Sequence, residues 1–115
     1  MFEYRARILR IIDGDTVEAE IDLGFQVSLW ATLRLAGIDT PELRGPTHEA
    51  GVAAADYLEL LLTKLAGPER QITVRTQKDR TGKYGRYLAD LVVGDRNLNQ
   101  ALVQAGHART LEKSR

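Results

Sequence analysis

The first segment of the chain that could do chemistry is Asp13-Gly14-Asp15, in which two carboxylates flank a glycine just before a predicted strand. Carboxylate oxygens are the ligands that hard divalent cations prefer. Asp-Gly is also common in tight hairpin turns, so an ordinary turn with a solvated Asp15 is the alternative. By itself this segment leaves both a metal site and a simple turn open.

The second segment runs from Arg34 to Glu42 and contains two more carboxylates, Asp39 and Glu42. Pro41 fixes its own φ and biases Thr40 away from helical conformation, so the turn that separates the two acids is stiff. Two carboxylates held close together repel each other unless a cation or an arginine compensates. A strand-ending turn with Thr-Pro as its punctuation is the alternative.

The third segment, 79–87, lies in the most basic stretch of a chain whose formal net charge is zero. Between positions 75 and 86 the bases are Arg75, Lys78, Arg80, Lys83 and Arg86, and the only acid is Asp79. Glycines on both sides of Lys83-Tyr84 let the backbone approach an anion, and an arginine offers phosphate a planar fork. A solvated hairpin loop is the alternative. Together, the three segments contain the groups that metal-assisted phosphodiester hydrolysis requires.

The composition restricts which metal could bind. The chain has 115 residues, the length of one domain (1–115), and it has no cysteine for a disulfide or a thiolate site. Its two histidines, His48 and His107, are in no ligand pattern, so zinc is disfavoured and any metal is expected to be oxygen-bound. Neither a signal peptide nor a membrane span is recognisable, so we expect a cytoplasmic chain unless it is a processed secreted form.

The elements that must position these residues can be predicted from hydrophobic periodicity. The predicted strands are Tyr4–Ile12, Thr16–Leu23, Phe25–Ala36, Gln71–Gln77 and Tyr87–Val93. In the third strand, the alternating apolar side chains from Phe25 to Leu35 are expected inside, with Arg34 on the opposite face. The first predicted helix begins at an N-cap, Thr47, and ends at Gly67-Pro68. The second predicted helix spans Asn97–Ala105. The order βββ-α-ββ-α predicts a mainly β (α+β) domain, a five-stranded Greek-key barrel of the OB type with two packed helices.

Four motifs in this order, IDGDTV, RLAGIDTPE, DRTGKYGR and LNQALVQAG, resemble the staphylococcal (micrococcal) nuclease, or thermonuclease, family. The resemblance runs from about Arg7 to Ala108. It implies one OB-fold domain and a calcium-dependent phosphodiesterase for DNA or RNA, preferring single strands. Similar enzymes cleave the bond between phosphorus and the 5′ oxygen and leave 3′-phosphates. We expect a monomer without a membrane partner, and a dimer is the alternative.

The resemblance also implies roles for individual residues. It implies Asp15, Asp39 and the main-chain carbonyl of Thr40 as calcium ligands. It implies Glu42 as the carboxylate that positions or deprotonates the attacking water. It implies Arg34 and Arg86 as phosphate-clamping arginines, and Lys83 and Tyr84 as contacts to a terminal phosphate.

Two departures from the family pattern leave room for other functions. The longer loop that follows Glu42 in the family is trimmed here, and Glu112 stands about where a product-stacking tyrosine is expected. A non-catalytic copy of the same fold, which binds nucleic acid or protein, is therefore one alternative. A generic OB domain that stacks single strands on Trp30, Tyr84 and Tyr87 is a second alternative.

Overall fold

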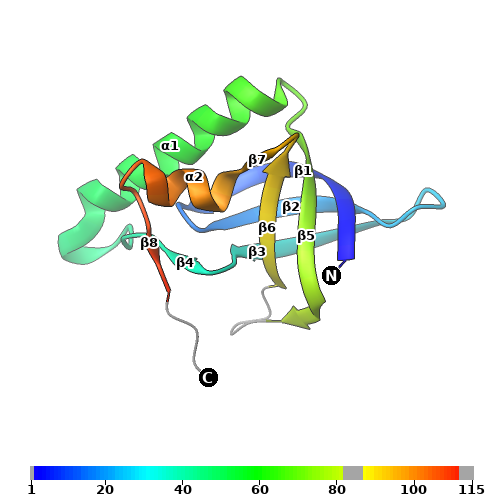
Figure 1. Cartoon of the computed structure of the whole chain (residues 1–115), viewed down its shortest axis with the longest axis horizontal. Coiled ribbons are helices and arrows are strands. Elements are labelled where there is room, and N and C mark those ends of the chain that lie inside the picture. Colours follow the sequence, from blue (N-terminus) through cyan, green and yellow to red (C-terminus); the bar gives the residue numbers. More distant parts are fainter. Residues whose placement is uncertain (1, 82–86, 112–115) are drawn as a thin grey trace.

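The computed structural model describes residues 2–81 and 87–111, with the side chains of 2–76 and 87–111 (Figure 1). The long strands are β1 (Phe2–Asp13), β2 (Thr16–Asp22), β3 (Ser28–Leu35), β5 (Gln71–Thr81) and β6 (Tyr87–Val93). The two-residue strands are β4 (Ile38–Asp39), β7 (Arg96–Asn97) and β8 (Arg109–Thr110). The helices are the 3-10 turn η1 (Gly45–Thr47), α1 (His48–Ala66) and α2 (Leu98–Gln104). In this described part of the chain, neither α-helix is both long and apolar enough to cross a membrane.

The long strands form a closed barrel. Their order is β3-β2-β1-β5-β6, and a parallel pairing between β3 and β6 joins the two ends of this sheet. The predicted fold class is confirmed: a mainly β, five-stranded barrel of the OB type with two packed helices. In Figure 1, α1 lies along one side of the barrel and α2 lies between α1 and β6.

The core fills the barrel and the space beneath α1. Along β2 the side chains of Val17, Ala19 and Ile21 are buried, as their alternation predicts. The α1 stripe at helical spacing also points inward, with Ala54, Leu58, Leu61 and Leu62 buried. Burial of one such leucine stabilises the fold by about 2 kcal/mol. The apolar face of β2 and the apolar stripe of α1 therefore pack into one core.

The third strand begins later in the structure than the sequence predicts. β3 begins only at Ser28, because Phe25 and Gln26 form the turn with φ values of 54° and 63°. The predicted inward position of Phe25 and Val27 was wrong, since these side chains are exposed. Leu29 points into the open end of the barrel and is partly exposed there, whereas Leu33 and Leu35 are buried as predicted. The reason is that the β2–β3 hairpin extends past the end of the barrel, where no strand faces it (Figure 1).

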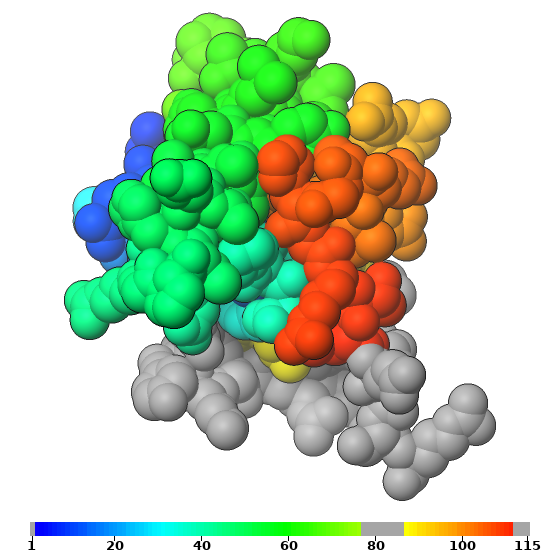
Figure 2. Space-filling model, turned by 90° about the vertical axis from the view of Figure 1, so that its left-hand side faces the viewer, coloured from blue at the N-terminus to red at the C-terminus, as the bar shows by residue number. Residues whose placement is uncertain are grey.

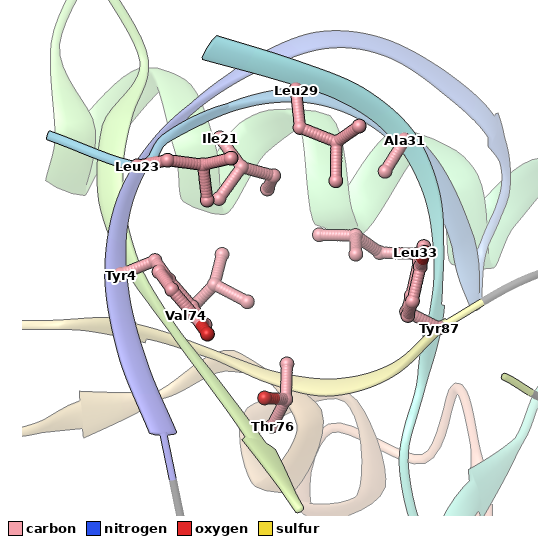
Figure 3. A pocket seen from close by; sticks show the side chains of 9 residues that line it. All are labelled: Tyr4, Ile21, Leu23, Leu29, Ala31, Leu33, Val74, Thr76 and Tyr87. Carbon is pink, nitrogen blue, oxygen red and sulfur yellow. The ribbon is translucent and has the colours of Figure 1, made fainter. Parts of the chain in front are cut away.

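The barrel end opposite α1 is open. Figure 3 looks into this end, where side chains from five strands line a cavity of about 330 Å³. They are Tyr4, Ile21, Leu23, Leu29, Ala31, Leu33, Val74, Thr76 and Tyr87. Trp30 lies on the outside of the wall, where its indole N–H donates to Glu20 at 3.4 Å. Trp30 and Tyr87 thus face opposite sides of the barrel wall and do not form one stacking surface, and Tyr84 lies outside the described residues.

A buried asparagine connects α2 to the strand ends. Asn99 is 2% exposed, and its side chain accepts from the N–H of Leu91 and donates to the carbonyl oxygens of Ala36 and Ala89 at 3.0–3.1 Å. Ala36 follows β3 directly, on the way to the short strand β4. Asn99 therefore fixes the chain just before the acidic turn that the sequence singles out.

Candidate active site

Strand pairing brings the first two chemical segments together. β2 and β3 are antiparallel neighbours, and their register places Thr16 opposite Arg34. The backbone N–H of Leu35 donates to the carbonyl oxygen of Asp15 at 2.8 Å. Asp15, at the start of β2, therefore lies beside Arg34, at the end of β3, although the two are far apart in sequence.

Arg34 bridges two carboxylates. Its Nη1 lies 3.2 Å from Asp15 Oδ2, and its Nη2 lies 3.2 Å from Asp39 Oδ1. Nη1 also donates to the carbonyl oxygens of Leu35 and Ile38 at 3.0 Å. The side chain of Arg34 is only 17% exposed, so its charge is weakly screened by water. The guanidinium thus has a fixed position between Asp15 and Asp39.

Asp15 is held in its charged form. Oδ2 accepts from the backbone N–H of Thr40 at 3.0 Å, and Oδ1 accepts from the hydroxyl of Thr16 at 3.1 Å. Burial acts to raise the pKa of Asp15, but the hydrogen bonds from Asp13 and Thr40 and the charge of Arg34 outweigh burial, so the pKa is lowered. The bond to Thr40 also ties the first segment to the second.

Asp13, one of the two carboxylates of the first segment, also belongs to the site, although the family resemblance implies no role for it. Its Oδ1 accepts from the backbone N–H of Asp15 at 3.1 Å. Burial, and then the hydrogen bond and charge repulsion with the Asp15 carboxyl, raise the pKa of Asp13 to about 6. Asp13 and Asp15 therefore form an acidic pair whose full ionisation a nearby cation would favour.

The structure adds a second arginine that the sequence analysis missed. β4 and β8 are antiparallel, with Asp39 opposite Arg109, and Arg109 Nη2 lies 3.4 Å from Asp39 Oδ2. Both oxygens of Asp39 therefore contact guanidinium groups. No periodicity or motif predicts a two-residue strand such as β8, because its pairing depends on the position and direction of the chain after α2.

Glu42 lies on a groove next to this cluster. The groove has a volume of about 560 Å³ and is lined by 39–42, Thr47 and 106–109. Figure 2 shows it as a hollow in which the cyan segment lies between the green start of α1 and the red strand β8. Glu42 itself is exposed, and among the described residues no ion pair or hydrogen bond joins its carboxylate to Asp15, Arg34 or Asp39.

The start of α1 holds the backbone of Glu42. Thr47, predicted as the N-cap, occupies the N-cap position but makes no side-chain capping bond. Its hydroxyl donates instead to the carbonyl oxygen of Glu42 at 2.8 Å, and His48 Nδ1 lies 2.6 Å from the carbonyl oxygen of Leu43. Gly51 packs against the same backbone: a Cβ there would lie 2.6 Å from the Glu42 oxygen. Contacts from Thr47, His48 and Gly51 thus position the backbone at Glu42 and Leu43.

Replacement of Gly51 by alanine is therefore expected to displace the Glu42 backbone. The new methyl group would meet main-chain atoms, which cannot rotate away as a flexible side chain could. We expect hydrolysis of single-stranded DNA to slow by on the order of tenfold to a hundredfold, the scale of a shift of about 1 Å in a reacting group. Steady-state kinetics with a thermal melt of each variant check this.

The control is Ala53→Gly, an exposed change in the same helix turn, which costs about 1 kcal/mol of helix propensity. If Gly51→Ala loses no more activity than this control, Gly51 does not position Glu42.

The donor set fits a hard cation in an open site. Among the described residues there is no group of three or more His, Cys, Asp or Glu side chains placed to hold a metal. Asp15 and Asp39 supply two carboxylates at one guanidinium, and the backbone N–H of Thr40 donates to Asp15, so Thr40 lies next to the pair. Calcium takes six to eight oxygens, so such a site would be completed by water and substrate oxygens.

The remaining predicted site residues, Lys83, Tyr84 and Arg86, lie outside the described residues, as does Glu112. The residues directly after Arg86 are described, and they lie in β6 beside β3: Tyr87 pairs with Leu33, and Leu88 pairs with Arg34.

The sequence of the chain is similar to those of known nucleases. The sequence profile described as staphylococcal nuclease homologue matches residues 32–115. The chain is 32% identical to a thermonuclease of Staphylococcus hyicus over 93% of its own length and 59% of the relative. It is 31% identical to a thermonuclease of Staphylococcus intermedius, with 89% and 56% covered. It is also 31% identical to Endonuclease YhcR of Bacillus subtilis (strain 168), with 94% and 9% covered.

The chain therefore spans little more than half the length of these thermonucleases and a small part of the endonuclease. The profile match covers most of the chain, and it includes the segment with Arg34, Asp39 and Glu42. With the OB-type barrel, this match shows that the chain belongs to the staphylococcal nuclease homologue family.

Proposed function

We propose that this chain is a calcium-dependent phosphodiesterase that hydrolyses DNA or RNA, preferring single strands. The observation that carries the proposal is the contact of one guanidinium, Arg34, with both Asp15 and Asp39 at 3.2 Å. Carboxylates for a hard cation and an arginine for phosphate thus lie within one cluster, next to a groove that contains another carboxylate, Glu42. The names of the relatives, thermonuclease and endonuclease, support the same activity.

Asp15, Asp39 and the main-chain oxygen of Thr40 are the proposed calcium ligands. A bound calcium would supply Lewis-acid chemistry, drawing charge from a non-bridging phosphate oxygen. Arg34 is the proposed ligand of the same phosphate group, because its guanidinium lies between the two carboxylates that would hold the cation. Arg86 is the proposed second arginine, and Lys83 and Tyr84 are the proposed contacts to a terminal phosphate.

Glu42 is the proposed general base. It accepts a proton from water while the water oxygen forms a bond to phosphorus. The bond between phosphorus and the 5′ oxygen then breaks, and the leaving oxygen takes a proton from solvent, which leaves a 3′-phosphate on the other fragment. Arg34 and Arg86 stabilise the charge that grows on the phosphate oxygens. Because the site binds phosphates rather than base edges, both DNA and RNA are substrates.

The proposal is tested with the purified chain, heat-denatured DNA and calcium. We expect fragments that carry 5′-hydroxyl and 3′-phosphate ends. Polynucleotide kinase should then label the fragments without prior dephosphorylation, and a polymerase should extend them only after the 3′-phosphate is removed. Fragments with 5′-phosphates would contradict the proposed bond cleavage. Binding of the DNA without any cleavage would instead favour the non-catalytic alternative.

A further inference from the structure

Arg109 lies directly opposite a proposed calcium ligand. The β4–β8 register pairs Asp39 with Arg109, and their closest side-chain atoms, Asp39 Oδ2 and Arg109 Nη2, are 3.4 Å apart. The other oxygen of Asp39 lies 3.2 Å from Arg34 Nη2. A cation that takes an oxygen of Asp39 must therefore compete with one of two guanidinium groups.

The two arginines differ in how firmly they are held. Arg34 is 17% exposed and also contacts Asp15 and two backbone carbonyl oxygens. The side chain of Arg109 is 78% exposed, and within the described part of the chain its one ion pair is the longer contact to Asp39. Exposed ion pairs contribute little to stability, because water and salt screen them. Arg109 is therefore the guanidinium that a cation can displace.

The surroundings of Arg109 indicate where the displaced side chain would bind. Arg109 lines the groove of about 560 Å³ together with Glu42, Thr47 and His107 (Figure 2). Among the described residues that line this groove, Arg109 is the only arginine or lysine. The volume lies within the range of about 300–1,000 Å³ that small-molecule sites occupy, so the groove has room for a nucleotide beside the reacting phosphate.

We propose that Arg109 holds Asp39 in the cation-free protein and, when a cation takes Asp39, binds the substrate phosphate next to the one that is cleaved. This inference rests on the proposed function, since it assumes that Asp39 is a cation ligand. Arg109 then opposes cation binding when nucleic acid is absent and supports nucleic-acid binding when the cation is present. By linkage, each of the two ligands tightens the binding of the other.

The experiment measures two binding constants in Arg109→Ala. Isothermal titration calorimetry with calcium alone should show binding about two- to fivefold tighter than in the parent chain, the scale of one exposed ion pair. Fluorescence anisotropy with labelled hexathymidylate in saturating calcium should show binding weakened by about tenfold, the scale of one charged hydrogen bond. The anisotropy is measured in a Glu42→Gln background, so that turnover is slow.

Two further variants serve as controls. Arg96→Ala removes another exposed arginine, from β7 and outside the groove, and should change neither constant. Arg109→Lys keeps the charge but loses the planar fork, so its oligonucleotide affinity should lie between those of the parent chain and Arg109→Ala.

Opposite signs for the two constants are the signature of the proposed exchange. If Arg109→Ala leaves calcium affinity unchanged or weakens it, Arg109 does not compete at Asp39. If oligonucleotide affinity stays at the parent value, Arg109 does not bind phosphate. Either result, in a parent chain that binds calcium and cleaves DNA, overturns this inference alone. A parent chain that neither binds calcium nor cleaves DNA overturns the proposed function.

Discussion

Replacement of Glu42 by glutamine is expected to slow hydrolysis of single-stranded DNA by about a hundredfold or more, the scale of a lost general base. Glutamine keeps the size and polarity of the side chain but cannot accept a proton from water. The side chain of Glu42 is exposed and its carboxylate has no ion-pair partner among the described residues, so the fold should be unaffected. The measurement is the initial rate of acid-soluble product release in saturating calcium, with a thermal melt for each variant.

Glu49→Gln is the matched control for this prediction. Glu49 is an exposed acid in the first turn of α1, and it does not line the groove. The same chemical change at Glu49 should leave the rate close to that of the parent chain. If Glu42→Gln hydrolyses DNA at the parent rate, Glu42 is not the base, whatever the metal does.

Removal of calcium by a chelator is expected to have the largest effect, a loss of rate on the order of a thousandfold or more. Without a cation, a phosphate that approaches the cluster meets the carboxylates of Asp15 and Asp39, and the guanidinium groups of Arg34 and Arg109 are already paired with these carboxylates. Repulsion of the substrate and loss of charge stabilisation then act together. The measurement is the hydrolysis rate during titration with chelator, followed by restoration with excess calcium.

Zinc distinguishes an oxygen site from a nitrogen or sulfur site. We expect that zinc will not restore the rate after chelation, because the proposed ligands are all oxygens and zinc prefers histidine and cysteine. Asp39→Asn should respond to calcium only at much higher concentrations, since it removes one of the two carboxylates. Undiminished hydrolysis in excess chelator would contradict a metal mechanism for this chain.

The sequence predicts best where a residue's environment follows from its neighbours along the chain. Alternation in β2 and the helical stripe of α1 correctly identify Val17 and Leu58 as core residues. Alternation fails for Phe25, which is fully exposed, because a strand can continue past the layer that would cover it. Periodicity determines which face of a strand is apolar, but only the length of the neighbouring strands determines whether that face is covered.

The site shows the same division. Asp15, Arg34 and Asp39 stand out in the sequence as charged residues at turns, and the structure brings them into contact. Asp13, Gly51 and Arg109 could not be assigned in the same way. Asp13 matters because it is buried beside Asp15, Gly51 because the backbone of Glu42 approaches it closely, and Arg109 because the short strand β8 pairs with β4. Each of these features depends on the folded structure and not on local sequence.

The amino-acid sequence by itself determined the barrel, its two helices and the kinds of charged group available, since periodicity and turn residues act over short distances along the chain. Only the tertiary structure decided which charges touch. The β2–β3 register sets Arg34 beside Asp15, and the β4–β8 pairing sets Arg109 against Asp39. The physical reason is that electrostatic interactions depend on distances of a few ångströms through space, and folding fixes these distances through contacts remote from the charges themselves.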